Sequence, residues 1–286
     1  LGYMICCKSI RPENILTVTY TVAATRDMKA RFVRIFGEEH ADKLTFRTIN
    51  GLCAVAIRYY AGKKGAQPFA LADDEARLNA VVRELLSKGG GGYPSDQQVK
   101  EARTHITFCK NMMLSDAEVE AQRVDGMDFP AVYKGYQAFL LKNHLMDFDD
   151  QMVFTYRIFR QYPDILAHFQ HRWPFLCVDE AQDTSKIQHA ILRLLASKSR
   201  NIFMVGDEDQ SIYGFRAAWP QALLEFENTY PGAKVLMMET NYRSTKSIVE
   251  AADAFIQRNE SRHPKHMRTD NPQGAPIRKV ALADYN

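Results

Sequence analysis

Residues 176–184 read Leu-Cys-Val-Asp-Glu-Ala-Gln-Asp-Thr, an apolar run that ends abruptly in two acids. The segment 175–178 is typical of a buried strand in a parallel sheet, because such strands are nearly continuous apolar runs. Acids at the end of a buried strand are costly unless they bind a cation or act on a reacting water. The stretch therefore predicts a chemical site at Asp179 and Glu180. Taken alone, the dipeptide fits a solvated turn before a helix about equally well.

Four further segments have the same apolar, β-branched character, and they are Ile15–Tyr20, Leu44–Ile49, Ile202–Val205 and Val235–Met238. Patterns typical of helices follow most of the strands, at Ala23–Phe36, Gly51–Tyr60, Ile187–Ser197, Pro220–Tyr230 and Ser247–Arg258. Strands that alternate with helices predict an α/β fold with a parallel sheet.

A long interval between the second and third predicted strands has a different texture. Its patterns are helical throughout, at Asp73–Ser87, Asp96–Met113, Asp116–Val124 and Pro130–Asn143. Several of these helices open on a polar residue that can cap them. We therefore predict an all-helical insertion over residues 63–146, after which the chain returns to the α/β body.

Composition sets broad limits on the class of protein. The 286 residues are 46% hydrophobic and 25% charged, which is typical of globular domains. The net charge of +3 permits nucleic-acid binding without arguing for it. The five cysteines are scattered, which favours reduced thiols in the cytoplasm. No apolar run reaches the roughly 18–20 residues that a membrane span needs.

Two other predicted strands also end in polar side chains. After the strand at 202–205, Gln210 could donate to a terminal phosphate, while Phe215 and Arg216 offer a stacking face and a cation. After the last strand, Arg243 could reach phosphate oxygens and Tyr242 could lie flat on a base. Each segment alone could be a turn, a core aromatic or a helix cap. Three strand ends with related chemistry favour a functional site, since such ends meet at one edge of the sheet.

The order and spelling of these segments resemble the superfamily 1 DNA helicases of the UvrD/Rep/PcrA type. Residues 178–184 resemble that family's motif II, 205–218 its motif III and 241–245 its motif IV. Upstream, 18–28 is similar to motif Ia and 48–53 to motif Ib. The resemblance implies a RecA-like domain 1A over 1–62 and 147–243, a 1B-like helical insertion over 63–146, and the start of a second motor domain over 244–286.

The resemblance also implies residue roles, with ATP and Mg²⁺ as cofactors. Asp179 would hold Mg²⁺, Glu180 would act as base on the hydrolytic water, and Gln210 would sense the γ-phosphate. Arg243 would contact the same phosphate, and Tyr242 would stack on adenine. Implied partners are single-stranded DNA and duplex junctions, with movement 3′→5′, and unidentified repair or recombination proteins. The implied DNA contacts are Tyr20, Thr21, Thr48, Asn50, Tyr213, Phe215 and Arg216.

Several positions depart from the family pattern. The only Gly-Lys pair, Gly62-Lys63, lacks the other residues of a phosphate-binding loop, so a solvated basic patch explains it better. Asn50 stands where the family usually has His, and Ala23 replaces a common Lys. We expect the chain to start downstream of the phosphate loop and to stop before motifs V and VI. Such a fragment should be inactive by itself.

Two other functions are compatible with the same motifs. One is a non-motor protein that uses the scaffold to bind DNA or protein, although four retained site residues argue against it. The other is the motor part of a helicase–nuclease subunit, which would differ only beyond residue 286.

Overall fold

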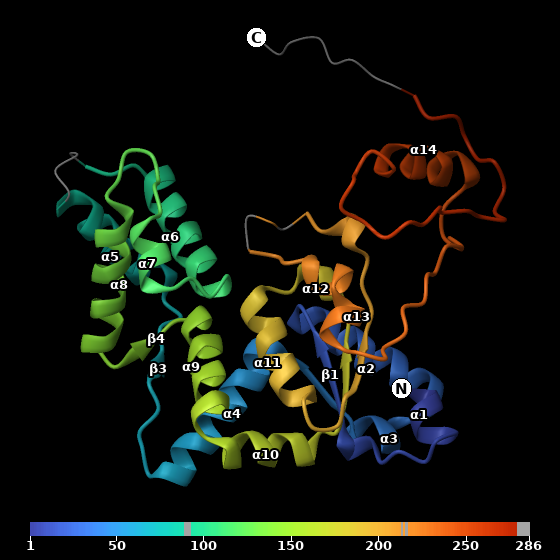
Figure 1. Cartoon of the computed structure of the whole chain (residues 1–286), viewed down its shortest axis with the longest axis horizontal. Coiled ribbons are helices and arrows are strands. Elements are labelled where there is room, and N and C mark those ends of the chain that lie inside the picture. Colours follow the sequence, from blue (N-terminus) through green and yellow to red (C-terminus); the bar gives the residue numbers. More distant parts are fainter. Residues whose placement is uncertain (89–92, 213, 215–216, 279–286) are drawn as a thin grey trace. The chain divides into compact units, whose positions relative to one another are not determined.

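The computed structural model describes residues 1–88, 93–212, 214 and 217–278 and contains a four-stranded parallel sheet (Figure 1). The strand order is β2-β1-β5-β6. The bounds are β1 (Ile15–Thr19), β2 (Thr45–Thr48), β5 (Phe175–Val178) and β6 (Asn201–Met204). Each neighbouring pair is parallel, so the carboxyl ends lie at one edge of the sheet. The predicted α/β fold is confirmed.

The side chains of β1 and β6 suit their positions, β1 inside the sheet and β6 at its edge. All five residues of β1 are buried, with Ile15 and Leu16 at 0% exposure. In β6 the pattern alternates, and Phe203 is 61% exposed. A strand with both faces covered must be apolar throughout, whereas an edge strand tolerates exposed side chains.

The prediction of a fifth strand at residues 235–238 is wrong. Among the described residues this segment pairs with no strand. Leu236 and Met238 are each 81% exposed. The local pattern favours a strand, but a strand forms only when a neighbour pairs with its backbone N–H and C=O groups. The predicted helix 220–230 is also interrupted at Glu225 (φ −99°, ψ 17°), which separates α12 (Gln221–Leu224) from α13 (Phe226–Thr229).

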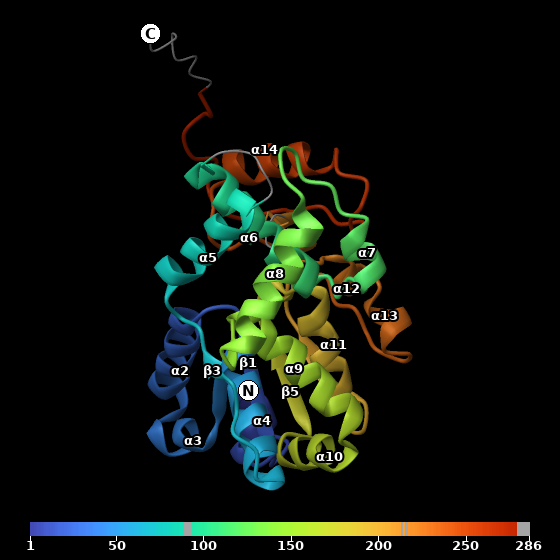
Figure 2. The same cartoon turned by 90° about the vertical axis from the view of Figure 1, so that its left-hand side faces the viewer.

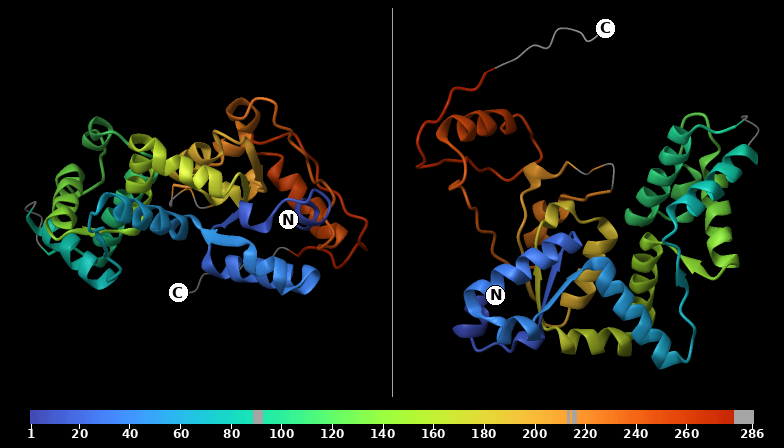
Figure 3. Two further views of the ribbon diagram at one scale, coloured as in Figure 1. Left: turned by 90° about the horizontal axis from the view of Figure 1, so that it is seen from below. Right: turned by 180° about the vertical axis from the view of Figure 1, so that it is seen from behind.

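Helices cover both faces of the sheet (Figure 3). On one face lie α2 (Val22–Phe36) and α3 (Glu38–Lys43), and on the other lie α9 (Phe148–Gln161), α10 (Pro163–Arg172) and α11 (Lys186–Ala196). Helix α4 (Ile49–Lys64) packs along α9, and the short α1 (Gly2–Cys6) precedes the sheet. In the described part of the chain no helix is both long and apolar enough to cross a membrane. All five cysteines are free thiols.

The insertion is a bundle of helices with a core of its own (Figure 2). Its helices are α5 (Glu75–Lys88), α6 (Asp96–Asn111), α7 (Asp116–Glu120) and α8 (Phe129–Lys142). Phe129 and Tyr136 are among the largest buried side chains of that core. The chain enters beside β3 (Ala70–Leu71) and leaves through β4 (Leu145–Met146), and these two strands pair in parallel. The insertion and the sheet belong to one compact unit, the first unit, which comprises Leu1–Asp207 and Ser211–Ala222. The domain boundaries expected from the sequence stay predictions.

A buried ion cluster joins the insertion to α9. Lys110 of α6, with 2% of its side chain exposed, lies 2.6 Å from Asp147 and 2.8 Å from Asp150. The Tyr136 hydroxyl donates to Asp147 at 3.1 Å. Asp147 also caps α9 by accepting from the Asp150 N–H at 2.7 Å. Burial by itself lowers the pKa of Lys110, but the surrounding carboxylates outweigh burial and raise it. Lys110 is therefore charged and fully compensated.

Asp149 makes this cluster sensitive to pH. Burial, and then the charge of Asp147, raise the pKa of Asp149 to about 6, although Lys110 and hydrogen bonds from Thr107 and Asn111 oppose the rise. An unfolded Asp has a pKa of about 3.9. The folded state therefore holds the Asp149 proton more tightly, and this stabilisation is present below pH ~4 and lost as pH rises to ~6.

Replacing Asp149 by Asn is expected to remove this dependence. The free energy of unfolding of the wild type, minus that of Asp149→Asn, should fall by on the order of 2 kcal/mol between pH 4 and pH 6. Urea unfolding at several pH values measures it, with the exposed Asp125→Asn as control. A difference that stays constant over that range would show that Asp149 titrates normally.

The second compact unit comprises Glu208–Gln210 and Leu223–Asn286. Its main helix is α14 (Lys246–Ile256). The Lys246 and Ser247 N–H groups donate to the carbonyls of Pro272 and Gln273, at 3.1 and 3.0 Å. Gly274, at φ +76°, permits this approach, because a Cβ there would lie 2.5 Å from Thr245.

Candidate functional site

The acidic turn follows β5 at the carboxyl edge of the sheet. The Asp179 N–H donates to the Val18 carbonyl at 3.0 Å, so the β1 ladder extends to the first acid. Glu180 then adopts the left-handed conformation, with φ 52° and ψ 45°. A non-glycine residue in this conformation costs on the order of 1 kcal/mol and persists where its surroundings require it. The strain directs the chain into the short 3-10 turn Ala181–Asp183.

Gln182 is the buried residue that fixes this turn. Its side chain is 2% exposed and its Nε2 donates to Glu180 Oε2 at 2.8 Å. Its Oε1 accepts from the Asp207 N–H at 3.1 Å, and its carbonyl accepts from the Ser211 hydroxyl at 3.2 Å. One amide side chain therefore joins the acids after β5 to the loop after β6, and it orients the Glu180 carboxylate.

The carboxylates of the turn suit a divalent cation. Burial and then the charge of Glu180 raise the pKa of Asp179, although the Glu180 N–H and Arg31 lower it. The same two causes raise the pKa of Asp183. Asp183 Oδ1 is buried and has no hydrogen-bond partner among the described residues. Like-charged acids held together in this way would be relieved by a cation.

Within the described ranges, no three His, Cys, Asp or Glu side chains are grouped so that they could hold a metal by themselves. Mg²⁺ does not need such a group, because it usually takes one or two protein carboxylates and completes its shell with water and substrate phosphates.

Thr184 and His189 form a buried pair that supports the turn. The Thr184 hydroxyl donates to the Ala181 carbonyl at 2.6 Å and lies 2.5 Å from His189 Nε2. Burial lowers the pKa of His189 to about 4, so the imidazole is neutral at pH 7. The turn is therefore anchored to α11 without adding charge beside the carboxylates.

A cavity of about 1130 Å³, here called the sheet–insertion groove, lies in the first unit above the carboxyl ends of β1 and β2. Three of the predicted DNA contacts line it, namely Tyr20, Thr48 and Asn50. Asn50 Oδ1 is buried and has no hydrogen-bond partner in the described part of the chain. It could accept from a donor on a ligand, such as the amino group of a base.

The insertion supplies the other wall of the groove with charges of both signs. Arg103 lies 2.9 Å from Glu75, and Arg83 is paired with Asp96. Because these two arginines already have acidic partners, they should attract a phosphate less than unpaired cations would. The other polar residues along this wall are Asn79, Lys100, Thr104, Thr107 and Asn111.

The remaining predicted site residues lie elsewhere. Gln210, Tyr242 and Arg243 belong to the second compact unit, and Tyr242 is 81% exposed. Thr21 is exposed and caps α2, since its hydroxyl accepts from the Ala24 N–H at 3.0 Å. Tyr213, Phe215 and Arg216 lie outside the described residues.

Sequence reasoning assigned no role to Gln182 or Arg31. Gln182 lies within the quoted acidic stretch, but its importance comes from partners reached only through the fold. Arg31, on α2, lies far from Asp179 in sequence, and no local signal connects them. A polar residue inside a buried turn is the one hint that could have marked Gln182.

Comparison with known proteins shows the family of the chain. Residues 1–231 match the family model of the UvrD/REP helicase N-terminal domain. The ATP-dependent DNA helicase PcrA of Staphylococcus epidermidis is 36% identical over 282 residues, which cover 97% of this chain and 38% of that protein. PcrA of Staphylococcus aureus (strain Mu50) is 35% identical with the same coverage. The chain spans about 38% of the length of these relatives. On this evidence the chain belongs to the UvrD/REP helicase family.

Proposed function

We propose that this chain provides the metal-and-water side of an ATP site, and part of a single-stranded DNA track, in a DNA translocase. The observation that carries the proposal is the Asp179–Glu180 turn. It lies at the carboxyl edge of a parallel sheet, is held by a buried amide, and is in the same unit as the large sheet–insertion groove. Ligands of open α/β sheets bind at this edge. The relatives named ATP-dependent DNA helicase support the same assignment.

The two acids would divide the work of phosphoryl transfer. Mg²⁺, bound with ATP and held by Asp179, would neutralise charge on the phosphate oxygens. Glu180 would accept a proton from the attacking water at its carboxylate, which Gln182 holds in one orientation at 2.8 Å. Gln210 and Arg243 would contact the γ-phosphate, and Tyr242 would stack on adenine.

The sheet–insertion groove would hold single-stranded DNA. Tyr20 contributes an aromatic side chain, Thr48 and Asn50 contribute polar groups, and both walls of the groove include polar residues. Thr21, Tyr213, Phe215 and Arg216 would extend the contacts. Stacking tolerates any base sequence, which a moving protein requires. We assign 3′→5′ movement and duplex unwinding to the whole protein as part of this proposal.

The chain by itself should not hydrolyse ATP. Its 286 residues contain no Gly-rich loop followed by Lys and Ser or Thr. Without that loop's N–H groups and Lys, little would hold the β- and γ-phosphates.

Replacing Tyr20 by Ala tests the DNA track. Loss of one stack is expected to weaken binding of an oligo-dT strand by about 5- to 150-fold, equivalent to 1–3 kcal/mol. Fluorescence anisotropy with the chain as it stands measures this, and Tyr3→Ala is the matched control because Tyr3 is 65% exposed and does not line the groove. Equal affinities for the two variants would remove Tyr20, and with it this groove, from the DNA path.

A further inference from the structure

The acid next to Gln210 is held by a buried arginine. Arg262 Nε donates to Asp209 Oδ1 at 2.9 Å, and Arg262 Nη2 donates to Asp209 Oδ2 at 2.7 Å. The side chains of Arg262 and Asp209 are only 6% and 9% exposed. Burial raises the pKa of Asp209, but the hydrogen bonds from Arg262 and Lys265 outweigh it and lower that pKa. A two-point contact of this kind fixes the orientation of the carboxylate as well as its position.

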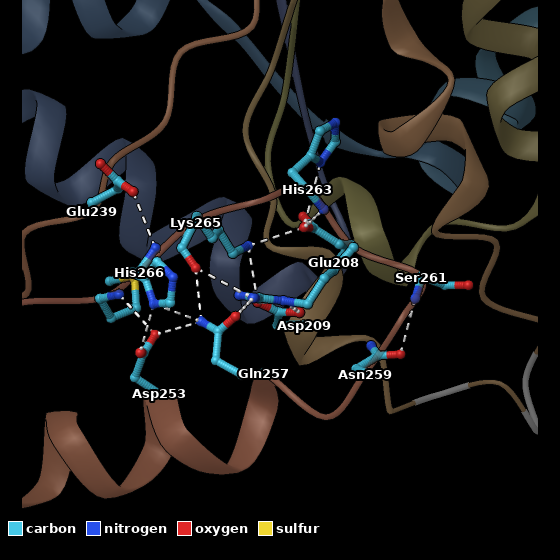
Figure 4. A network of polar contacts seen from close by, with 12 residues as sticks. Glu208, Asp209, Glu239, Asp253, Gln257, Asn259, Ser261, His263, Lys265 and His266 are labelled. Atoms are coloured by element: carbon cyan, nitrogen blue, oxygen red, sulfur yellow. Dashed lines mark hydrogen bonds and ion pairs between the residues drawn. The ribbon is translucent and has the colours of Figure 1, made fainter.

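The preceding acid, Glu208, is held from the same segment (Figure 4). The His263 N–H donates to Glu208 Oε1 at 2.9 Å. Lys265 Nζ lies 3.2 Å from both Glu208 Oε1 and Asp209 Oδ2. Both residues before Gln210 are therefore tied to residues 262–265. This explains why Glu208–Gln210 belongs to the second compact unit although β6 belongs to the first.

The same segment continues to the turn that carries Arg243. The His266 N–H donates to Glu239 Oε1 at 3.1 Å (Figure 4). The Asn241 N–H donates to the Arg268 carbonyl at 2.7 Å. Asn241 Oδ1 in turn accepts from the Arg243 N–H at 2.9 Å. Residues 262–268, here called the strut, therefore contact the segments of both predicted phosphate-binding residues.

Helix α14 supports the strut. Arg262 Nη1 donates to Gln257 Oε1 at 2.7 Å, at the end of that helix. The Met267 N–H donates to Asp253 Oδ1 at 2.9 Å. The strut is hydrogen-bonded to the segment of Gln210, to the segment of Arg243 and to α14. It therefore cannot shift at one end without breaking several hydrogen bonds.

We propose that the strut holds Gln210 and Arg243 in one geometry, with Arg262 as the positioning residue for Gln210. The inference rests on the proposed function, in which both residues face the γ-phosphate. Removing Arg262 would leave the Asp209 carboxylate buried without its main partner, and the turn would move to rehydrate it. A misplacement of about 1 Å can cost on the order of 100-fold in rate, because the residue no longer meets the reacting group.

The first test uses the chain as it stands and measures geometry. Arg262→Gln is expected to speed amide hydrogen exchange in a peptide covering residues 205–214 by about tenfold, with α11 unchanged. Arg262→Lys should fall between Arg262→Gln and the wild type, because it keeps the charge and loses the fork. Arg258→Gln is the control, since Arg258 is exposed at the end of α14. Unchanged exchange in 205–214 for Arg262→Gln would overturn the positioning role.

The second test measures kcat for DNA-stimulated ATP hydrolysis by the full-length protein. Arg262→Gln should lower kcat by about 10- to 100-fold. In a Gln210→Ala background the same change should lower kcat by less than about twofold, because residues that act as a unit are not additive. A full second loss would show that Arg262 does not act through Gln210. Normal kcat for Gln210→Ala would refute the proposed γ-phosphate role, while the exchange result would still decide the positioning.

Discussion

Replacing Glu180 by Gln in the full-length protein is expected to abolish DNA-stimulated ATP hydrolysis while ATP binding persists. The amide has the shape of the carboxylate, and its oxygen can still accept from Gln182 Nε2, which now lies 2.8 Å away. The strained turn should therefore keep its geometry. An amide cannot take a proton from water, so turnover should fall by about 10²–10⁴-fold. Steady-state phosphate release measures turnover, and binding of a fluorescent ATP analogue measures affinity.

The control for this variant is Glu227→Gln, which removes an exposed acid of α13. It should retain normal turnover. Near-normal ATP hydrolysis by Glu180→Gln would contradict the assignment of Glu180 as the base. Equal loss of hydrolysis and of nucleotide binding would point to collapse of the turn, and Gln182→Ala should then reproduce it.

Replacing Lys110 by Met is expected to destabilise the first unit by about 3–5 kcal/mol. The methionine fills a similar volume, but Asp147 and Asp150 lose the cation that lies 2.6 and 2.8 Å away. Both carboxylates are almost completely buried, at 10% and 5% exposure, so water cannot compensate them. Urea unfolding followed by tryptophan fluorescence reports on this unit, because Trp173 and Trp219 both belong to it.

Lys134→Met is the matched control, since Lys134 is 68% exposed and paired with Glu120. An exposed pair contributes about 0–1 kcal/mol, so this variant should unfold close to the wild type. Adding Asp147→Asn and Asp150→Asn to Lys110→Met should recover part of the loss, because the two carboxylates nearest the missing cation are then replaced by neutral amides. If Lys110→Met and Lys134→Met have equal free energies of unfolding, the ion cluster does not stabilise the junction between the insertion and α9.

The sequence predicted helices and strands well where apolar and polar residues follow a pattern over a few positions. The run at 175–178 predicts a strand, because its residues are apolar and the two residues after it are acids. The caps of α6 and α9 follow from Ser95 and Asp147 in the same way. These features depend on residues a few positions apart, so the printed sequence contains what is needed to predict them.

Only the tertiary structure decided which of these residues act together. Residues 235–238 have a strand-like pattern, yet pairing needs a neighbour that no local pattern supplies. Gln182 meets Asp207, 25 residues away, and Lys110 meets Asp147, 37 residues away. The strut joins Asp209 to Arg262 across 53 positions.

The sequence therefore predicted a chemical role for the acids at 179–180 from their place after a buried strand. Their orientation, the groove in the same unit and the strut beside Gln210 were decided by the fold, because hydrogen bonds between distant segments form only when packing brings those segments together.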